Sequence, residues 1–403
     1  MDKTNKLATV YEWFSSGQGN ISKLAIAYFF SNLYFYLPVG TIYLQSRGLN
    51  YVQINSLWGI IVGAMFLTEV PTGMLADRWG RKRSINVALA LQLLGEVMYI
   101  FADSYLLFVL TSVVAGVGFA FASGCLEALT YDSLKALDRQ EESLPGAMSK
   151  AMGSISAAQR AANLIAFPLG GLLIGELTQA RFVIGIIATA CAVGVGWLVS
   201  LTLKETSIGM PAHENSLVLL VDGLKLLRDN RAFRRLALLA LTTIPFRDYL
   251  GMYQPRLIEV GLLPVGLGVV QSAAAGLSIV GARYAYWIEQ RLGSRASLLL
   301  VTSLPGLLYL VAAAAVHPIF SPGAFCLLSG SMSLKDPLFS AHLNRHIASR
   351  SRATVLSMIS MVSGLYVALM GLLIGRIGDL SLTWAFVFMG GVVLLGSLVL
   401  RGE

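Results

Sequence analysis

The feature that most constrains this chain is its series of long apolar runs. A helix needs about 20 mostly apolar residues to cross the hydrocarbon core of a bilayer, and many such runs occur in the 403 residues. Only 13% of the residues are charged, against about 25% in an ordinary soluble domain. We therefore expect an all-α integral membrane protein, because backbone in lipid must satisfy its hydrogen bonds within each helix.

Counting the apolar runs predicts twelve transmembrane helices. We expect them at 24–44, 55–76, 85–102, 105–131, 149–175, 181–203, 235–258, 265–288, 297–317, 319–340, 353–375 and 382–400. A long polar interruption halves the series. It predicts an N-terminal six-helix bundle over 1–203, a cytoplasmic central loop over 204–234 and a C-terminal six-helix bundle over 235–403. Part of this loop has apolar residues at helical spacing, so an amphipathic surface helix and a plain linker are both open.

The basic residues predict the orientation. Loops on one side of the predicted helices carry twenty Lys and Arg residues and loops on the other side carry four. Because basic residues favour the cytoplasmic side, both termini are expected to be cytoplasmic. The formal charge of +8 follows this loop pattern, so nucleic-acid binding is not expected. The polar N-terminus has no short apolar core with a cleavage site, and we expect no removable signal peptide.

The two halves show signs of a duplication. When the sequence is shifted by 213 positions, six residues between Tyr36 and Val52 meet identical residues, and Arg78 and Gly80 meet Arg291 and Gly293. The pentapeptide GLLIG occurs at 171–175 and again at 371–375. The matches keep a common order, which favours two pseudo-symmetric bundles. Repeated halves that rock around a site at the membrane midplane are a common transporter design.

A dense charge cluster, PTGMLADRWGRKRS at 71–84, lies between the second and third predicted helices. It has a glycine, an acid, a basic residue, another glycine and two more basic residues, namely Gly73, Asp77, Arg78, Gly80, Arg81 and Lys82. This pattern and the twelve-helix arrangement resemble the major facilitator superfamily. The segments EVPTGMLADRWGRK and SGCLEALTYDSL most resemble its bacterial drug-efflux members.

The resemblance implies a conformational latch at this turn, formed by Gly73, Asp77, Arg78, Gly80, Arg81 and Asp132. Asp77 would cap the eleventh helix near Ala353 and Thr354, where free amides favour a carboxylate. Arg81 would reach Asp132 at the end of the fourth helix. The alternative is a solvated topology anchor, since an exposed ion pair contributes only ~0–1 kcal/mol.

Two departures from the family pattern bear on proton-driven export. Ser112 stands where such exporters often carry an arginine in the fourth helix. In the fifth helix, Phe167 and Pro168 alter a glycine and proline pattern that many drug/proton antiporters share.

Polar and ionisable residues inside the predicted helices are the candidates for substrate binding and coupling. A charge at mid-bilayer costs at least ~2.5–3.5 kcal/mol on insertion scales. The family fold implies that the first, fourth, seventh and tenth helices line a cavity. The candidates are Asn32, Tyr36, Glu127, Arg160, Asp248, Lys335 and Asp336. Asp248 and Glu127 are the expected proton carriers, with Asp336 behind them, and Glu96 is a further acid at depth. The alternative role for all of them is to join helices.

No enzyme signature occurs in the chain. The three cysteines are scattered through apolar runs and no phosphate loop is present, so neither a disulfide framework nor a metal or other cofactor is expected. We predict a secondary active transporter, monomeric in the inner (plasma) membrane, whose partners are lipid, protons and a small-molecule substrate. One hypothesis is proton-coupled efflux of amphipathic, drug-like compounds by alternating access. The alternative is an uptake carrier for an anionic or zwitterionic metabolite, and a non-transporting receptor is a third possibility.

Overall fold

A computed structural model describes residues 19–137, 144–206, 249–335, 337–339 and 352–399, together with 234, 238–239, 241, 246 and 342. The secondary structure of these residues is helical, and no strand occurs among them. They form two compact units. Among the described residues, the first unit contains 19–37, 63–173 and 180–206, and the second contains 38–62, 174–179 and the residues from 234 onward.

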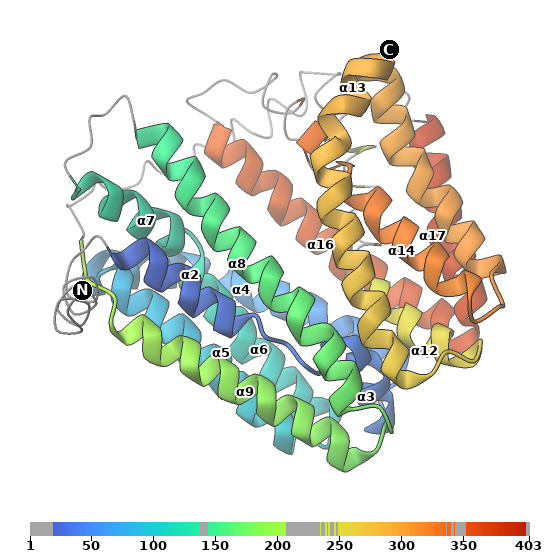
Figure 1. The fold of residues 1–403 in the computed structure, drawn as a ribbon, viewed down its shortest axis with the longest axis horizontal. Helices are drawn as coiled ribbons and strands as arrows, with labels where there is room; N and C mark the ends of the chain where they lie inside the picture. The colour runs from blue at the N-terminus through green and yellow to red at the C-terminus, as the bar shows by residue number, and fades with distance from the viewer. Residues whose placement is uncertain are drawn as a thin grey trace, which may run out of the picture. The chain divides into compact units, whose positions relative to one another are not determined.

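The first unit is a bundle of long helices that bury their apolar faces against one another (Figure 1). Its helices are α2 (Asn20–Ser31), the end of α4 (Tyr51–Trp79), α5 (Arg81–Phe101), α6 (Tyr105–Ala122), α7 (Cys125–Lys135), α8 (Leu144–Leu173) and most of α9 (Gln179–Leu201). Helix α2 packs against α8, α5 against α6, and α7 against both α5 and α8. Leu24, Ile85, Leu129 and Ile155 are buried in the shared core.

The second unit contains the start of α4 and the short elements η2 (Leu37–Val39) and α3 (Gly40–Ser46), except that Leu37 belongs to the first unit. It continues with η4 (Leu250–Met252), α12 (Tyr253–Glu259), α13 (Pro264–Ala314), α14 (Phe320–Ser333), α16 (Arg352–Leu380) and α17 (Leu382–Val399). Helix α13 packs against α14 and α17. At the start of α4, the Asp379 carboxylate accepts hydrogen bonds from the amides of Tyr51, at 2.7 Å, and Val52, at 3.4 Å.

Seven helices in the described part of the chain are long and apolar enough to cross a membrane. This agrees with a multi-pass helical membrane protein, while the number twelve stays a prediction. One of the seven, α13, covers both of the spans predicted at 265–288 and 297–317. Its chain reverses at Gly293, whose backbone is not helical.

Two predicted helices are interrupted. The span predicted at 24–44 ends as α2 at Ser31, runs without helix through 32–36 and resumes as η2 and α3. Asn32 terminates α2, and its side-chain amide donates to the Tyr28 carbonyl at 2.8 Å. The span predicted at 105–131 is divided into α6 and α7 at Ser123 and Gly124, where Gly124 has a φ of 70°. Serine and glycine pairs are common causes of such sharp bends.

The backbone repeats at the shift of 213 positions that the sequence indicates. Elements η2 and η4 coincide under this shift, as do α3 and α12 at both ends and the first residues of α4 and α13. Gly80 has φ 93° and ψ 156°, and its counterpart Gly293 has φ 76° and ψ 164°. Gly48 and Gly261 both have positive φ as well. The described chain therefore contains two copies of a helical unit whose elements from η2 to the start of α4 recur from η4 to the start of α13.

Candidate functional site

The interruption between α2 and α3 is held in place by two contacts with distant helices. The Phe35 amide, which has no helical partner, donates to the Thr189 hydroxyl on α9 at 3.0 Å. On α8, Gly170 lies so close to Phe35 that a Cβ at this glycine would overlap the Phe35 carbonyl. The absence of a side chain at Gly170 therefore lets the non-helical segment lie directly against α8.

Glu96 of α5 lies beside this interruption. Its side chain is 7% exposed. The Tyr36 hydroxyl donates to Glu96 Oε1 at 3.4 Å, while Oε2 has no hydrogen-bond partner within the described part of the chain. The Tyr36 ring is stacked on the ring of Tyr99, with centroids 5.3 Å apart. The Glu96 carboxyl group is therefore buried next to the non-helical segment 32–36 and close to the ring of Tyr36.

A second polar contact ties the interruption to α5. The Gln92 side-chain amide donates to the Ser31 carbonyl and to the Tyr34 hydroxyl, each at 2.8 Å. The carbonyl of Ser31 is one of those that the end of α2 leaves free. Gln92 therefore satisfies a free carbonyl at the end of α2 and holds the Tyr34 hydroxyl. Glu96 lies one turn further along α5, on the same side of the helix as Gln92.

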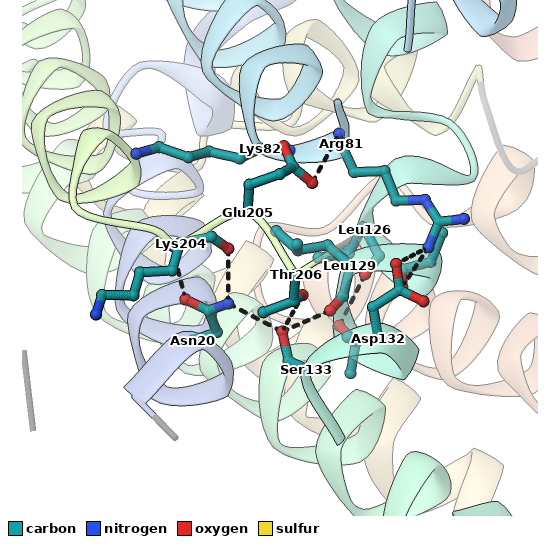
Figure 2. Close-up of polar contacts among 12 residues, drawn as sticks. Asn20, Arg81, Lys82, Leu126, Leu129, Asp132, Ser133, Lys204, Glu205 and Thr206 are labelled. Carbon is teal, nitrogen blue, oxygen red and sulfur yellow. Dashed lines mark hydrogen bonds and ion pairs between the residues drawn. The ribbon is translucent and has the colours of Figure 1, made fainter. Parts of the chain in front are cut away.

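The charged turn predicted as a latch lies at the N-terminus of α5 (Figure 2). There, the Glu205 carboxylate accepts hydrogen bonds from the amides of Arg81 at 3.2 Å and Lys82 at 3.0 Å. These amides have no partner within the helix, and a carboxylate also interacts favourably with the positive end of the helix dipole. A Cβ at Gly80 would overlap this carboxylate, so the turn needs glycine both for its backbone angles and for the cap.

The Arg81 guanidinium donates to the Asp132 carboxylate and, at 3.1 Å, to the Ala128 carbonyl (Figure 2). The Asp132 side chain is 2% exposed and that of Arg81 is 14% exposed. This contact is the one that the family resemblance implied between the third and fourth predicted helices. Its role as a conformational latch stays a prediction.

Asn20 joins three segments at the same end of the first unit (Figure 2). Its amide donates to the Ser133 hydroxyl and to the Lys204 carbonyl, each at 2.9 Å, and its Oδ1 accepts from the Lys204 amide at 3.0 Å. The start of α2, the end of α7 and the chain leaving α9 are thereby connected. Neither Asn20 nor Glu205 was among the residues expected from the sequence.

The remaining predicted residues are placed as follows. Five of the predicted site residues are exposed on the surface of the first unit, namely Gly73, Asp77, Arg78, Glu127 and Arg160. Lys335 is buried, and its Nζ lies 5.5 Å from the centroid of the Phe339 ring. Asp248 and Asp336 lie outside the described residues. Asp77 and the predicted cap position at Ala353 and Thr354 belong to different compact units, so that cap also stays a prediction.

Many secondary transporters are built from repeated halves that contain interrupted helices, and the described part of this chain has a repeat and an interrupted first helix at 32–36. The family model described as Major Facilitator Superfamily matches residues 24–365, and the chain belongs to this family. This match does not separate drug-efflux members from other members of the family, so the drug-efflux subtype stays a prediction.

Three relatives illustrate the similarity. The chain is 22% identical over 357 residues to the uncharacterized MFS-type transporter YxaM of Bacillus subtilis (strain 168), covering 84% of each protein. It resembles the crystal structure of the nucleoside transporter NupG with a TM-score of 0.76 at 14% identity, over 94% of this chain and 98% of that one. A bacterial homolog of the human lysosomal transporter Spinster, in an inward-facing and unoccupied conformation, matches with a TM-score of 0.69 at 16% identity, over 96% and 95% of the two chains. At such low identity, the two structures show the fold alone.

Family membership establishes the general activity. The chain is a multi-pass membrane transporter for a small-molecule substrate and is not an enzyme.

Proposed function

We propose that the chain is a proton-coupled exporter of small amphipathic organic compounds that works by alternating access. The observation that carries the proposal is the interrupted first helix, where Tyr34 and Tyr36 lie beside the Glu96 carboxyl group. Interrupted helices commonly form the binding sites of transporters. Aromatic faces provide apolar contact area and attract cations, while a carboxyl group is the polar partner that an organic cation or a proton requires.

The proposal retains the predicted membrane arrangement. It has twelve spans in two bundles, 1–203 and 235–403, joined by a central loop at 204–234, with both termini in the cytoplasm. The exporter works as a monomer in the plasma membrane. In this orientation the turn at 71–84 is cytoplasmic, and the latch comprises Gly73, Asp77, Arg78, Gly80, Arg81 and Asp132. The buried contact between Arg81 and Asp132 supports a defined geometry for this turn.

A deletion strain tests the proposed direction of transport. Cells without the gene are expected to become more sensitive to toxic amphipathic compounds, and the wild-type gene is expected to restore their resistance. The variant Tyr36→Ala should fail to restore it at equal membrane abundance. Trp384→Ala is the control, because this tryptophan is 66% exposed on α17. Unchanged sensitivity of the deletion strain to a broad set of such compounds would contradict efflux.

An uptake carrier for an anionic or zwitterionic metabolite is the second candidate. The buried Lys335 side chain favours it, because a carboxylate ligand needs a cation in a low-dielectric site. This function predicts that the deletion strain loses growth on one nutrient. It also predicts that Lys335→Met, at equal membrane abundance, abolishes uptake of that nutrient into cells.

A further inference from the structure

Glu96 and Asp132 are the buried acids among the described residues, and Glu96 lacks the arginine partner that Asp132 has. Its side chain is more than nine-tenths buried, Oε1 accepts one long hydrogen bond from Tyr36, and Oε2 has no partner. Among the described residues, no basic side chain forms an ion pair with it. An ionised carboxylate is costly to bury without a cation or further donors, whereas a protonated carboxyl group carries no charge to be solvated.

The groups around Glu96 are aromatic or neutral. Tyr34 and Tyr36 face it from the interrupted segment, and Tyr99 lies one turn further along α5. Helix α6, which packs against α5, contributes the ring of Phe108, whose centroid lies 5.1 Å from that of Tyr99. These tyrosines provide hydroxyl groups that can exchange hydrogen bonds with a carboxyl group, but they provide no positive charge at neutral pH.

In the second copy of the repeat, the position that corresponds to Glu96 is occupied by a residue that is not an acid. Glu96 lies sixteen residues after Gly80, and its counterpart sixteen residues after Gly293 is Tyr309. Tyr309 is fully buried, and its hydroxyl donates to the Phe246 carbonyl at 2.7 Å. Tyr249, the counterpart of Tyr36, likewise donates to a backbone carbonyl, that of Val367, at 2.7 Å. The repeated backbone is therefore compatible with neutral, hydrogen-bonded side chains at both positions.

We infer that Glu96 is the proton-binding site of this transporter and that Tyr36 is its positioning residue. Glu96 Oε2 takes a proton from a hydronium ion, which becomes water, and forms the new O–H bond, while Oε1 accepts the hydrogen bond from the Tyr36 hydroxyl, which keeps its own proton. Release returns the proton to water when the interrupted segment carrying Tyr36 moves. The inference rests on the proposed proton coupling, to which it gives a site, and it replaces Asp248 and Glu127 as the expected carriers.

Infrared spectroscopy of the purified protein tests proton binding without any substrate. The wild type is expected to show a carbonyl band of a protonated carboxyl group that disappears as the pH is raised. Glu96→Gln should lack this titrating band, whereas Tyr309→Phe and Glu69→Gln should keep it, the latter because Glu69 is an exposed acid on α4. An identical set of titrating bands in wild type and Glu96→Gln would overturn the inference, as would a band that never titrates.

Tyr36→Phe keeps the inference testable if Glu96→Gln does not fold. This variant removes the only hydrogen bond that the described residues give to the carboxyl group. The carbonyl band should therefore move to higher wavenumber, as it does when a carboxyl group loses a donor. An unmoved band would show that the titrating acid is another residue.

Transport in inverted vesicles separates this inference from the proposed function. With a compound identified by the sensitivity screen, Glu96→Gln should lose at least tenfold of the accumulation driven by a pH gradient, whereas Tyr309→Phe should keep it. Accumulation that still follows the pH gradient in Glu96→Gln would overturn the inference. If the wild type shows no pH-driven accumulation but the Glu96 band titrates, proton-coupled export fails while the proton site stands.

Discussion

Replacing Gly80 by alanine should destabilise the protein more than the same replacement at its repeat counterpart, Gly293. Gly80 has φ 93° and ψ 156°, and Gly293 has φ 76° and ψ 164°. Side chains other than hydrogen are strained in this part of conformational space by ~1–3 kcal/mol. The backbone penalty is thus common to the two substitutions, and the surroundings decide the difference between them.

The surroundings of the two glycines differ because Glu205 lies next to Gly80. A Cβ at Gly293 meets no atom of the described residues within 4 Å, whereas a Cβ at Gly80 overlaps the Glu205 carboxylate. To make room, this carboxylate must leave the amides of Arg81 and Lys82 that it caps. Losing such a cap costs ~0.5–2 kcal/mol. Gly80→Ala should therefore lower the free energy of unfolding by ~0.5–2 kcal/mol more than Gly293→Ala.

Denaturant-induced unfolding of the purified protein in detergent measures both substitutions. The decisive control is the Glu205→Ala background, in which the cap is already absent and Gly80→Ala should cost no more than Gly293→Ala. Such a double-mutant cycle isolates the coupling between Gly80 and Glu205. Equal effects of the two glycine substitutions in the wild type, or an excess that persists without Glu205, would refute the reasoning.

Three further perturbations have expected outcomes. Arg81→Ala leaves the buried Asp132 carboxylate without its cation and should lower the free energy of unfolding by ~3–5 kcal/mol, measured by the same denaturant unfolding. Gly170→Ala forces a Cβ into the backbone of the interrupted first helix and should reduce the yield of monodisperse protein in size-exclusion chromatography; Gly153→Ala, with nothing within 4 Å of its Cβ, should not. Asp379→Ala removes the carboxylate that caps α4 and should lower stability by ~0.5–2 kcal/mol, and an unchanged thermal melting point would contradict that role.

The membrane class, the duplication and the family could be predicted from the sequence because they depend on extended patterns. Hydropathy over about 20 residues is a local property, and a shift of 213 positions is visible from a few identical residues in a common order. The interruption at 32–36 could not be predicted in this way. It is fixed by Thr189 and Gly170, which lie far away in the sequence on other helices.

The candidate site was predicted only in part, because it too depends on contacts between residues that are far apart in the sequence. Tyr36 was expected from its polar and aromatic spacing, but Glu96 was not ranked among the coupling residues, because the family fold does not place its helix among those that line the cavity. What singles out Glu96 is burial together with an unpartnered oxygen, and neither property is visible in a sequence. Nothing in the sequence around Glu205 indicates a cap, because its contact with the N-terminus of α5 joins residues more than 120 positions apart.

Two positions show how this chain has diverged over a repeated backbone. The turns at Gly80 and Gly293 have nearly the same angles, yet among the described residues only the first turn is capped by an acid from a distant segment. The buried positions of Glu96 and Tyr309 are equally spaced from those turns, yet of the two only Glu96 carries a carboxyl group. The second copy has Tyr309 at the position that corresponds to Glu96, so the repeated backbone is compatible with a residue that is not an acid there. The charge of an acid at such a position is costly to bury, and this cost is the reason for the proposal that Glu96 binds a proton, which directs the search for coupling to the first unit.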